Sequence, residues 1–420
     1  MITPFGRLWA SACSSNLGDG IALTSFPLIA LTAGASPGEV ALVTTAATIA
    51  WPLCGLHAGW LVDRLSPQLL LTVANGARAL MLLGLTAAIA CDAFVAPAVM
   101  IAALVYGIAE TLVDTSLIAG IPRIVPKHQL TGANAKMEAT INIANELAGP
   151  PLAGFLLGAA GLAAAAVGSG LYALAALAGL SLLVAMRSRP TPAAAESATP
   201  DQPTPRIRDG LRYLWRDRLQ RELTVLTAAM SLIWGAWTAM FVLYAVAPGP
   251  LGLSTVAYGW VLAAMAVGGI VAAGLIERLQ RQVSTALLLF LDTVGTIGLV
   301  LPAALGAPLP VIVAGVILAG AGSTVWRVIV AVIRQQATPL SLLGRVYSAS
   351  RVISWGALPL GSALAALAVE SLDIETVFLI ASAVAGAVCV WFTLRFRSLH
   401  TRIAGLEAET NAETSIQPNG

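Results

Sequence analysis

The stretch STALLLFLDTVGTIGLVLPAALGAPLPVIVAGVILAGAGSTVWRVIVAVIRQ, residues 284–335, decides the fold class. It consists of two long apolar segments, 284–305 and 309–335, separated by a break that contains Gly306 and Pro308. A helix of about 20 apolar residues is enough to cross a hydrocarbon layer of about 30 Å. Each segment is therefore predicted to be a membrane-spanning helix.

Similar segments recur along most of the chain, in which 58% of the 420 residues are hydrophobic and 10% are charged. Soluble domains carry about 25% charged residues, so water is not the main solvent of this protein. A membrane β-barrel would instead alternate apolar and polar residues in segments of about ten. The sequence predicts an all-α membrane protein with twelve transmembrane helices, at 8–31, 39–62, 69–91, 96–122, 133–157, 161–186, 220–246, 254–277, 284–305, 309–335, 343–369 and 374–396.

Lysine and arginine are unevenly distributed over the connections between these spans. The connections around Ser36, Asp92, Gly158, Gly249, Gly306 and Asp373 contain neither residue. Both ends of the chain and the opposite connections contain Arg7, Arg64, Arg123, Lys127, Arg187, Arg189, Arg278, Arg281, Arg395, Arg397 and Arg402. Because positive charge gathers on the cytoplasmic side, we expect both termini to be cytoplasmic in a multi-pass protein of the cell (inner) membrane.

The chain also divides into two halves. A linker at 187–219 begins with RPTPAAAESATPDQPTP, which is too polar to fold alone, and continues as an amphipathic helix that is either interfacial or solvated. It separates two six-helix bundles, 1–186 and 220–397, and a disordered tail is expected at 398–420. The similarity of IPRIVPKHQLTGANAKM to VIRQQATPLSLLGRVYS indicates that the bundles are pseudo-symmetric, with a substrate path between them.

Several kinds of chemistry find no support in the sequence. Neither lysine ends a phosphate-binding GxxxxGK[ST] loop, and the three histidines lack metal-ligand spacing and any nucleophile arrangement. The four cysteines are scattered and are interpreted as packing residues. We therefore expect no enzymatic activity, no metal or other cofactor and no nucleic-acid partner.

Ionisable residues inside the spans are the strongest functional signal, because each costs about 2.5 to 3.5 kcal/mol on insertion scales and usually faces a cavity or a partner. Asp19 lies near the middle of the first span, and Asn16 shares its face. Glu110 and Asp114 are four residues apart, on one face of the fourth span. These three carboxylates are the candidates for proton coupling; the alternative is a static ion pair with Arg327 or Arg78. The remaining ionisable residues within spans are Glu138, Glu146, Asp292 and Arg351.

An aromatic stripe follows one face of the seventh span. It comprises Trp234, Trp237, Phe241 and Tyr244. The stripe could form a wall of a substrate cavity, although such a pattern is more often packed in the core or exposed to lipid. Trp326 and Arg327, in the tenth span, are the corresponding candidates in the second half.

A short motif after the second span carries a family resemblance. The segment GWLVDRLSPQL, with Gly59, Asp63 and Arg64, resembles the cytoplasmic loop signature GxLaDrxGrr of the major facilitator superfamily, without its later basic pair. The resemblance implies that Asp63 helps to lock a cytoplasmic gate, where Arg345 and Arg351 are available as partners.

The fifth span carries a second motif, GPPLAG, with Gly149, Pro150 and Gly154. It is similar to the GPxxGG motif of exporters and antiporters, and a close-packed helix interface is the alternative interpretation. With NLGDG, LTGAN, GLRYLWR and LGRVYS, it resembles the branch of this superfamily that contains macrolide-efflux, multidrug-efflux and enterobactin-export proteins. The resemblance implies alternating access, proton-driven export and a functional monomer.

The function expected from these features is proton-coupled export of drugs or other small amphiphilic molecules, with the lipid bilayer, the substrate and protons as partners. Two alternatives are a dedicated exporter of an endogenous metabolite such as a siderophore, in which Arg327 would pair an anionic group, and a lipid translocator.

Overall fold

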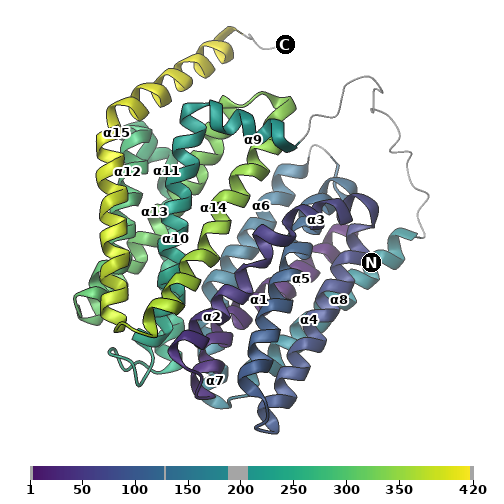
Figure 1. The fold of residues 1–420 in the computed structure, drawn as a ribbon. Helices are drawn as coiled ribbons and strands as arrows, with labels where there is room; N and C mark the ends of the chain where they lie inside the picture. Colours follow the sequence, from purple (N-terminus) through teal and green to yellow (C-terminus); the bar gives the residue numbers. More distant parts are fainter. Residues whose placement is uncertain (1–2, 127–128, 188–206, 417–420) are drawn as a thin grey trace. The chain divides into compact units, whose positions relative to one another are not determined.

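The computed structural model describes residues 3–126, 129–187 and 207–416, and these residues are mostly helical (Figure 1). The all-α fold class is therefore confirmed. The elements of the first half are α1 (Pro4–Thr32), α2 (Pro37–Thr48), α3 (Ala50–Arg64), α4 (Pro67–Ala90), α5 (Val95–Ile124), α6 (Leu130–Thr140), the π-helix η2 (Ile141–Ala148), α7 (Gly149–Ala159) and α8 (Ala163–Arg187). Those of the second half are α9 (Ile207–Arg216), α10 (Arg218–Ala245), α11 (Thr255–Gln282), α12 (Thr285–Ala304), α13 (Leu309–Ala337), α14 (Leu340–Val369) and α15 (Ile374–Ile416).

Two compact units account for these elements. The first contains Met1–Thr204 and Ala245–Ala263, and the second contains Pro205–Tyr244 and Ala264–Gly420. In the first unit α4 packs against α5 and α8, and α1 also packs against α8. In the second unit α12 packs against α13 and α15. Each unit thus packs one long helix, α4 or α12, against two neighbours. Residues 188–206 of the predicted linker lie outside the described part of the chain.

Nine helices among the described residues are long and apolar enough to span a membrane: α4, α5, α8, α10, α11, α12, α13, α14 and α15. Each corresponds to one predicted span. The other three predicted spans correspond to α1, to α2 with α3, and to α6 with η2 and α7. The helix α1 is long but carries Ser11, Asn16 and Asp19 along its buried face, whereas the other two spans are interrupted.

Prolines lie close to both interruptions, neither of which the predicted spans contained. The predicted span 39–62 breaks at Ile49, and Pro52 follows in the first turn of α3. The predicted span 133–157 passes through the π-helix η2 directly before Pro150 and Pro151. A proline has no amide hydrogen and clashes with the preceding turn, so it weakens the α-helical hydrogen-bond ladder where it lies. Proline alone does not decide the break, because α1 and α12 continue through Pro27 and Pro302.

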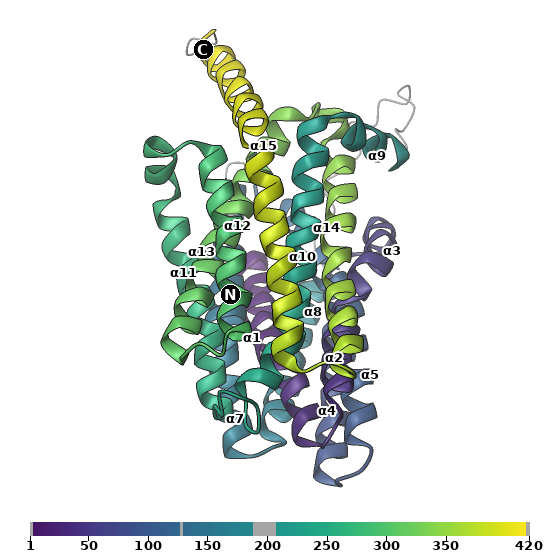
Figure 2. The same ribbon diagram turned by 60° about the vertical axis from the view of Figure 1, so that its left-hand side comes forward.

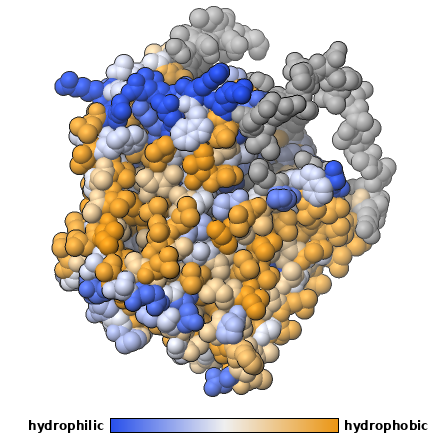
Figure 3. Space-filling view, viewed as in Figure 1, coloured by the Kyte–Doolittle hydropathy of each residue, from blue (hydrophilic) through white to orange (hydrophobic). Residues whose placement is uncertain are grey.

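Large apolar side chains on the outer faces of the helices remain exposed. Leu80, Leu367 and Leu394 are each more than 70% exposed. The face shown in Figure 3 carries extensive apolar surface of this kind. Such surface is unstable in water and suits contact with lipid tails, which is consistent with an integral multi-pass membrane protein.

The C-terminal helix differs from the prediction of a disordered tail at 398–420. Figure 2 shows α15 continuing as a helix beyond the end of its neighbour α12. Leu399 and Ile403 are buried, and the His400 ring stacks on Phe396 at 6.1 Å between centroids. The apolar periodicity that starts at Phe392 therefore extends past the predicted boundary, and the helix continues to Ile416. Residues 417–420 lie outside the described part.

The amphipathic helix α9 packs against the start of α14. Its Leu214 is fully buried, and a Cβ at Gly210 would lie 2.5 Å from the Cβ of Arg345. The hydroxyl of Tyr213 donates to the carbonyl of Ala337 at 2.6 Å. One face of α9 thus packs against α14 within the second unit, while Trp215 on another face stays exposed.

Candidate functional site

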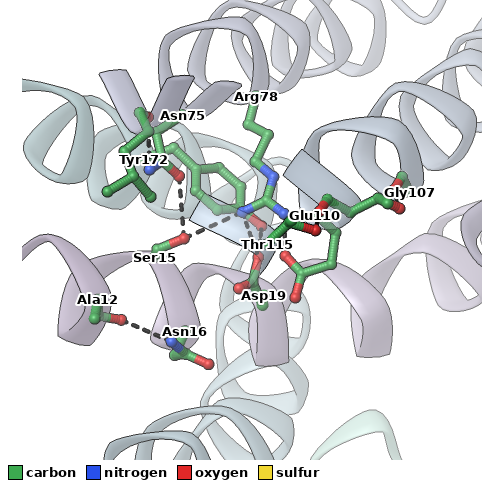
Figure 4. A network of polar contacts seen from close by, with 12 residues as sticks. Ala12, Ser15, Asn16, Asp19, Asn75, Arg78, Gly107, Glu110, Thr115 and Tyr172 are labelled. Atoms are coloured by element: carbon green, nitrogen blue, oxygen red, sulfur yellow. Dashed lines mark hydrogen bonds and ion pairs between the residues drawn. The ribbon is translucent and has the colours of Figure 1, made fainter. Parts of the chain in front are cut away.

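A buried arginine organises the polar interior of the first unit. Arg78 is in α4, and its side chain is 0% exposed. Its Nη1 lies 3.1 Å from Oδ1 of Asp19 in α1, and its Nη2 pairs with Oε2 of Glu110 in α5. Figure 4 shows the guanidinium pointing toward both carboxylates. One guanidinium therefore joins two carboxyl groups from two different helices.

Uncharged polar side chains complete this network. The hydroxyl of Tyr172, in α8, donates to Oδ1 of Asp19 at 2.7 Å. Ser15 accepts from Nη1 of Arg78 at 3.1 Å and donates to Oδ1 of Asn75 at 3.0 Å. Gly18 makes room for Tyr172, because a Cβ at this position would lie 2.9 Å from the tyrosine ring. The network thus links α1, α4, α5 and α8.

Two aromatic rings enclose the guanidinium. The Cζ atom of Arg78 lies 5.1 Å from the ring centroid of Tyr106 and 5.1 Å from that of Tyr172. A cation over an aromatic face is stabilised by the ring quadrupole, and more strongly where water is excluded. The rings therefore help to hold a charge that is costly to bury.

The charges of the network do not balance when both acids are ionised. One guanidinium neutralises one carboxylate, so the group of Asp19, Arg78 and Glu110 then carries one excess negative charge. Burying an uncompensated charge is costly, and a bound proton or a cation removes this cost. The side chain of Glu110 is 15% exposed and that of Asp19 is 2% exposed. A proton or a cation therefore has easier access to Glu110 than to Asp19.

The Tyr172 hydroxyl gives a direct test of this geometry. Tyr172→Phe keeps the ring but removes the hydrogen bond to Asp19, and hydrogen bonds to charged groups contribute about 1.5 to 3 kcal/mol. We expect a lower melting temperature for the purified variant in detergent. Tyr106→Phe is the matched control, because within the described residues its hydroxyl makes no hydrogen bond, while its ring lies equally far from Arg78. Equal melting temperatures for the two variants would contradict the geometry.

The sequence analysis identified part of this site. It singled out Asp19 and Glu110, and it named Arg78 as a possible static partner. Asp114 lies one turn further along α5 and is half-buried. Asn16, buried on α1, donates to the carbonyl of Ala12 at 2.9 Å. The sequence analysis missed Ser15, Asn75, Tyr106 and Tyr172, since uncharged polar and tyrosine side chains are common in membrane helices and gave no distinct signal.

The aromatic stripe of α10 is packed inside the second unit. Trp237, Phe241 and Tyr244 are all buried. The rings of Trp237 and Phe241 stack at 4.6 Å, and Tyr244 meets Phe378 of α15 edge to face at 5.5 Å. Trp234 is less buried and meets Trp237 at 6.2 Å. These contacts are those of core packing, the alternative that the spacing left open, and the substrate-cavity role stays a prediction.

The two candidates on α13 have different environments. The indole nitrogen of Trp326 donates to the hydroxyl of Thr227 at 3.0 Å. Arg327 is exposed, and its Nη2 lies 3.4 Å from the hydroxyl of Thr324. Neither Asp19 nor Glu110 uses Arg327 as its ion-pair partner, because both pair with Arg78.

The predicted gate residues lie in the last turns of α3 and in the first half of α14. Arg64 stacks over the ring of Trp60 at 4.1 Å, and Arg351 over that of Trp355 at 4.9 Å. The side chain of Asp63 and the surroundings of Gly59 lie outside the described part of the structure. The pairing of Asp63 with Arg345 or Arg351 would join the two units, and it stays a prediction.

The GPPLAG motif is a site of close helix contact. A Cβ at Gly149 would lie 2.5 Å from the Cα of Gly20 in α1. On another side, the hydroxyl of Thr255 donates to the carbonyl of Gly154 at 2.9 Å, and Gly259 approaches the carbonyl of Pro150. The motif therefore lets α7 pack closely against both α1 and the start of α11.

Substitution of Gly149 tests this interpretation. Gly149→Ala is expected to cost about 1 to 3 kcal/mol by overpacking, because the atoms that it meets belong to the backbone and cannot rotate away. Gly170→Ala is the matched control: this glycine, in α8, has no heavy atom near its missing Cβ, and the change is expected to gain about 0.5 to 1 kcal/mol. Equal changes in the melting temperature of the two purified variants would contradict the close contact.

No three His, Cys, Asp or Glu side chains gather as a metal ion would require within the described ranges.

The chain is similar to known proteins both in sequence and in fold. Over 385 residues, which are 90% of this chain and 91% of the relative, the chain is 26% identical to an uncharacterized MFS-type transporter, y4rN, of Sinorhizobium fredii (strain NBRC 101917 / NGR234). Its fold resembles a mutant of the nucleoside transporter NupG, with a TM-score of 0.76, 14% identity and coverage of 94% of this chain and 100% of that one. It also resembles a bacterial homologue of the iron transporter ferroportin in an inward-facing state, with a TM-score of 0.73, 15% identity and coverage of 94% and 98%. The profile of the Major Facilitator Superfamily matches residues 8–357, and the chain therefore belongs to this superfamily.

Proposed function

We propose that this membrane transporter is a proton-coupled exporter of small amphiphilic molecules that works by alternating access. The observation that carries the proposal is the buried group of Asp19, Arg78 and Glu110, with two carboxylates for one guanidinium. Buried ionisable groups inside a membrane are costly and mark proton relays and ion pathways. A purely structural bundle would gain little from such a group.

The charge imbalance suggests how protons and substrate exchange. A proton on Glu110 removes the excess negative charge and leaves Arg78 paired with Asp19 alone. A cationic amphiphile near Glu110 would remove the same charge, so either ligand disfavours the other. A proton that enters from outside would thus displace a substrate that entered from the cytoplasm, which is the requirement for antiport.

Other parts of the proposal rest on sequence. The motifs GPPLAG, NLGDG and LGRVYS support the drug/proton antiporter branch of the superfamily, and this resemblance also implies a functional monomer. The charge distribution supports an inner-membrane protein with both termini cytoplasmic. The superfamily members that share the fold include a nucleoside transporter and a homologue of an iron transporter. The fold alone therefore does not determine the substrate.

Efflux from energised cells tests the proposal. Cells producing the protein are loaded with fluorescent amphiphiles, such as cationic ethidium and a neutral dye, and efflux is followed with and without a protonophore. Protonophore-sensitive efflux of several compounds is expected. Efflux that persists after the proton gradient collapses would contradict proton coupling, and absence of any efflux would favour a dedicated metabolite exporter or a lipid translocator.

A further inference from the structure

The second unit contains a buried carboxyl group that the proposed exchange does not use. Asp292, in α12, is 2% exposed. It lies against α13 at Gly322, where a Cβ would overlap the Oδ1 atom of Asp292 and would lie 3.1 Å from its Cα. The absence of a side chain at Gly322 therefore makes the space that the carboxyl group fills.

Within the described residues, the Asp292 carboxyl group has neither an ion-pair partner nor a hydrogen-bond donor. The nearby hydroxyls are engaged elsewhere: Thr293 donates to the carbonyl of Phe290 at 2.7 Å, and Thr296 donates to the backbone carbonyl of Asp292 at 3.1 Å. The side chain thus differs from Asp19, which has both an arginine and a tyrosine as partners.

The helices packed against α12 offer Asp292 no counter-charge. Among the described residues, the helices with extensive contacts to α12 are α13 and α15. On α13, Arg327 is exposed beside Thr324, and the Nε of Arg334 donates to Gln220 at 3.3 Å. The charged or titratable residues of α15 are Glu375, Cys389, Arg395, Arg397, His400, Arg402, Glu407, Glu409 and Glu413. None of those that are described forms an ion pair with Asp292.

The corresponding helices of the two units, α4 and α12, therefore differ in the charged group that they bury. Both α4 and α12 begin at a capping serine, Ser66 or Ser284, and each packs against the helix that follows it. The first unit places Arg78 on this helix, with acids on its neighbours, whereas the second places an acid there with no cation. An ionised carboxylate without a partner is costly in an apolar interior, and binding a proton removes that cost.

We propose that Asp292 is a second proton-binding site of the transport cycle, located in the second unit. It holds a proton while α13 packs against it at Gly322, and it releases this proton when water reaches it during the transport cycle. The release step rests on the proposed proton coupling, whereas the binding of a proton does not.

Infrared spectroscopy of the purified protein tests the binding step without any substrate. At neutral pH, the spectrum of Asp292→Asn is expected to lack a carbonyl absorption of a protonated carboxyl group that the wild type shows. Loss of carboxylate absorption instead would overturn the proposal. Asparagine replaces a neutral acid almost atom for atom, so the variant is also expected to fold; failure to fold would equally contradict a protonated Asp292.

Thermal melting adds a matched comparison. Arg78→Met removes the cation that Asp19 and Glu110 share and is expected to lower the melting temperature clearly, whereas Asp292→Asn is expected to leave it almost unchanged. A similar loss in both variants would show that Asp292 is ionised and paired, which would refute the proposal.

Efflux of ethidium from energised cells tests the release step. Asp292→Asn is expected to lose protonophore-sensitive efflux, and Glu370→Gln, exposed at the end of α14, serves as the control. Unchanged efflux in Asp292→Asn would overturn a role in the cycle. Failure of the Glu110 hypothesis is distinguishable, because the infrared result for Asp292 does not depend on transport or on Glu110.

Discussion

Replacing Arg78 with methionine is expected to destabilise the protein more than any other single change in the first unit. The side chain is 0% exposed and lies between Asp19 and Glu110. Its loss leaves two buried carboxylates without a counter-charge, and breaking a buried ion pair in this way costs about 3 to 5 kcal/mol. The measurement is the thermal melting of the detergent-purified protein, together with the amount of folded protein recovered from membranes.

Two further variants make this result specific. Arg327→Met removes an exposed arginine from another apolar helix and is expected to change the melting temperature little. Combining Arg78→Met with Asp19→Asn and Glu110→Gln removes all three charges and is expected to recover part of the loss, because a neutral interior no longer needs a cation. The central role of Arg78 would be wrong if Arg78→Met melted at the same temperature as Arg327→Met.

Replacing Glu110 with glutamine is expected to abolish proton-driven efflux while the protein stays folded. An amide can still accept a hydrogen bond from Arg78 but cannot bind and release a proton, and Arg78 remains balanced by Asp19. The measurement is ethidium efflux from energised cells with and without a protonophore, corrected for the amount of protein in the membrane.

The control for this variant is Glu370→Gln, which removes an exposed carboxylate outside the network. It is expected to behave like the wild type. If Asp114 rather than Glu110 carried the proton, Glu110→Gln would keep its efflux and Asp114→Asn would lose it. Full protonophore-sensitive efflux in Glu110→Gln would thus remove Glu110 from the coupling role.

The sequence predicted the membrane architecture well because the hydropathy of a spanning helix is a local property. Long apolar segments such as 309–335 became single helices with nearly the predicted bounds. The breaks at Ile49 and before Pro150 were missed, since hydropathy is insensitive to where the hydrogen-bond ladder is interrupted. The tail was mispredicted for a related reason: Leu399 and Ile403 continue an apolar face after the average hydropathy has fallen.

The candidate site was predictable only where a residue is costly to bury. Asp19 and Glu110 attracted attention because ionised groups are expensive in a membrane. Which cation they meet depends on how α1, α4 and α5 pack together, and sequence spacing within a single helix contains no such information. Tyr172 and Ser15 were unpredictable for the same reason, because their hydrogen bonds cross between helices.

Proton release on substrate binding is the measurement that tests the central claim most directly. The purified protein, in weakly buffered detergent solution with a pH indicator, is mixed with a panel compound that the cells expel, such as ethidium. If proton and substrate compete for the negative charge around Arg78, binding by the wild type releases protons, and Glu110→Gln binds the compound with much less release. Binding by the wild type without any proton release would contradict the account.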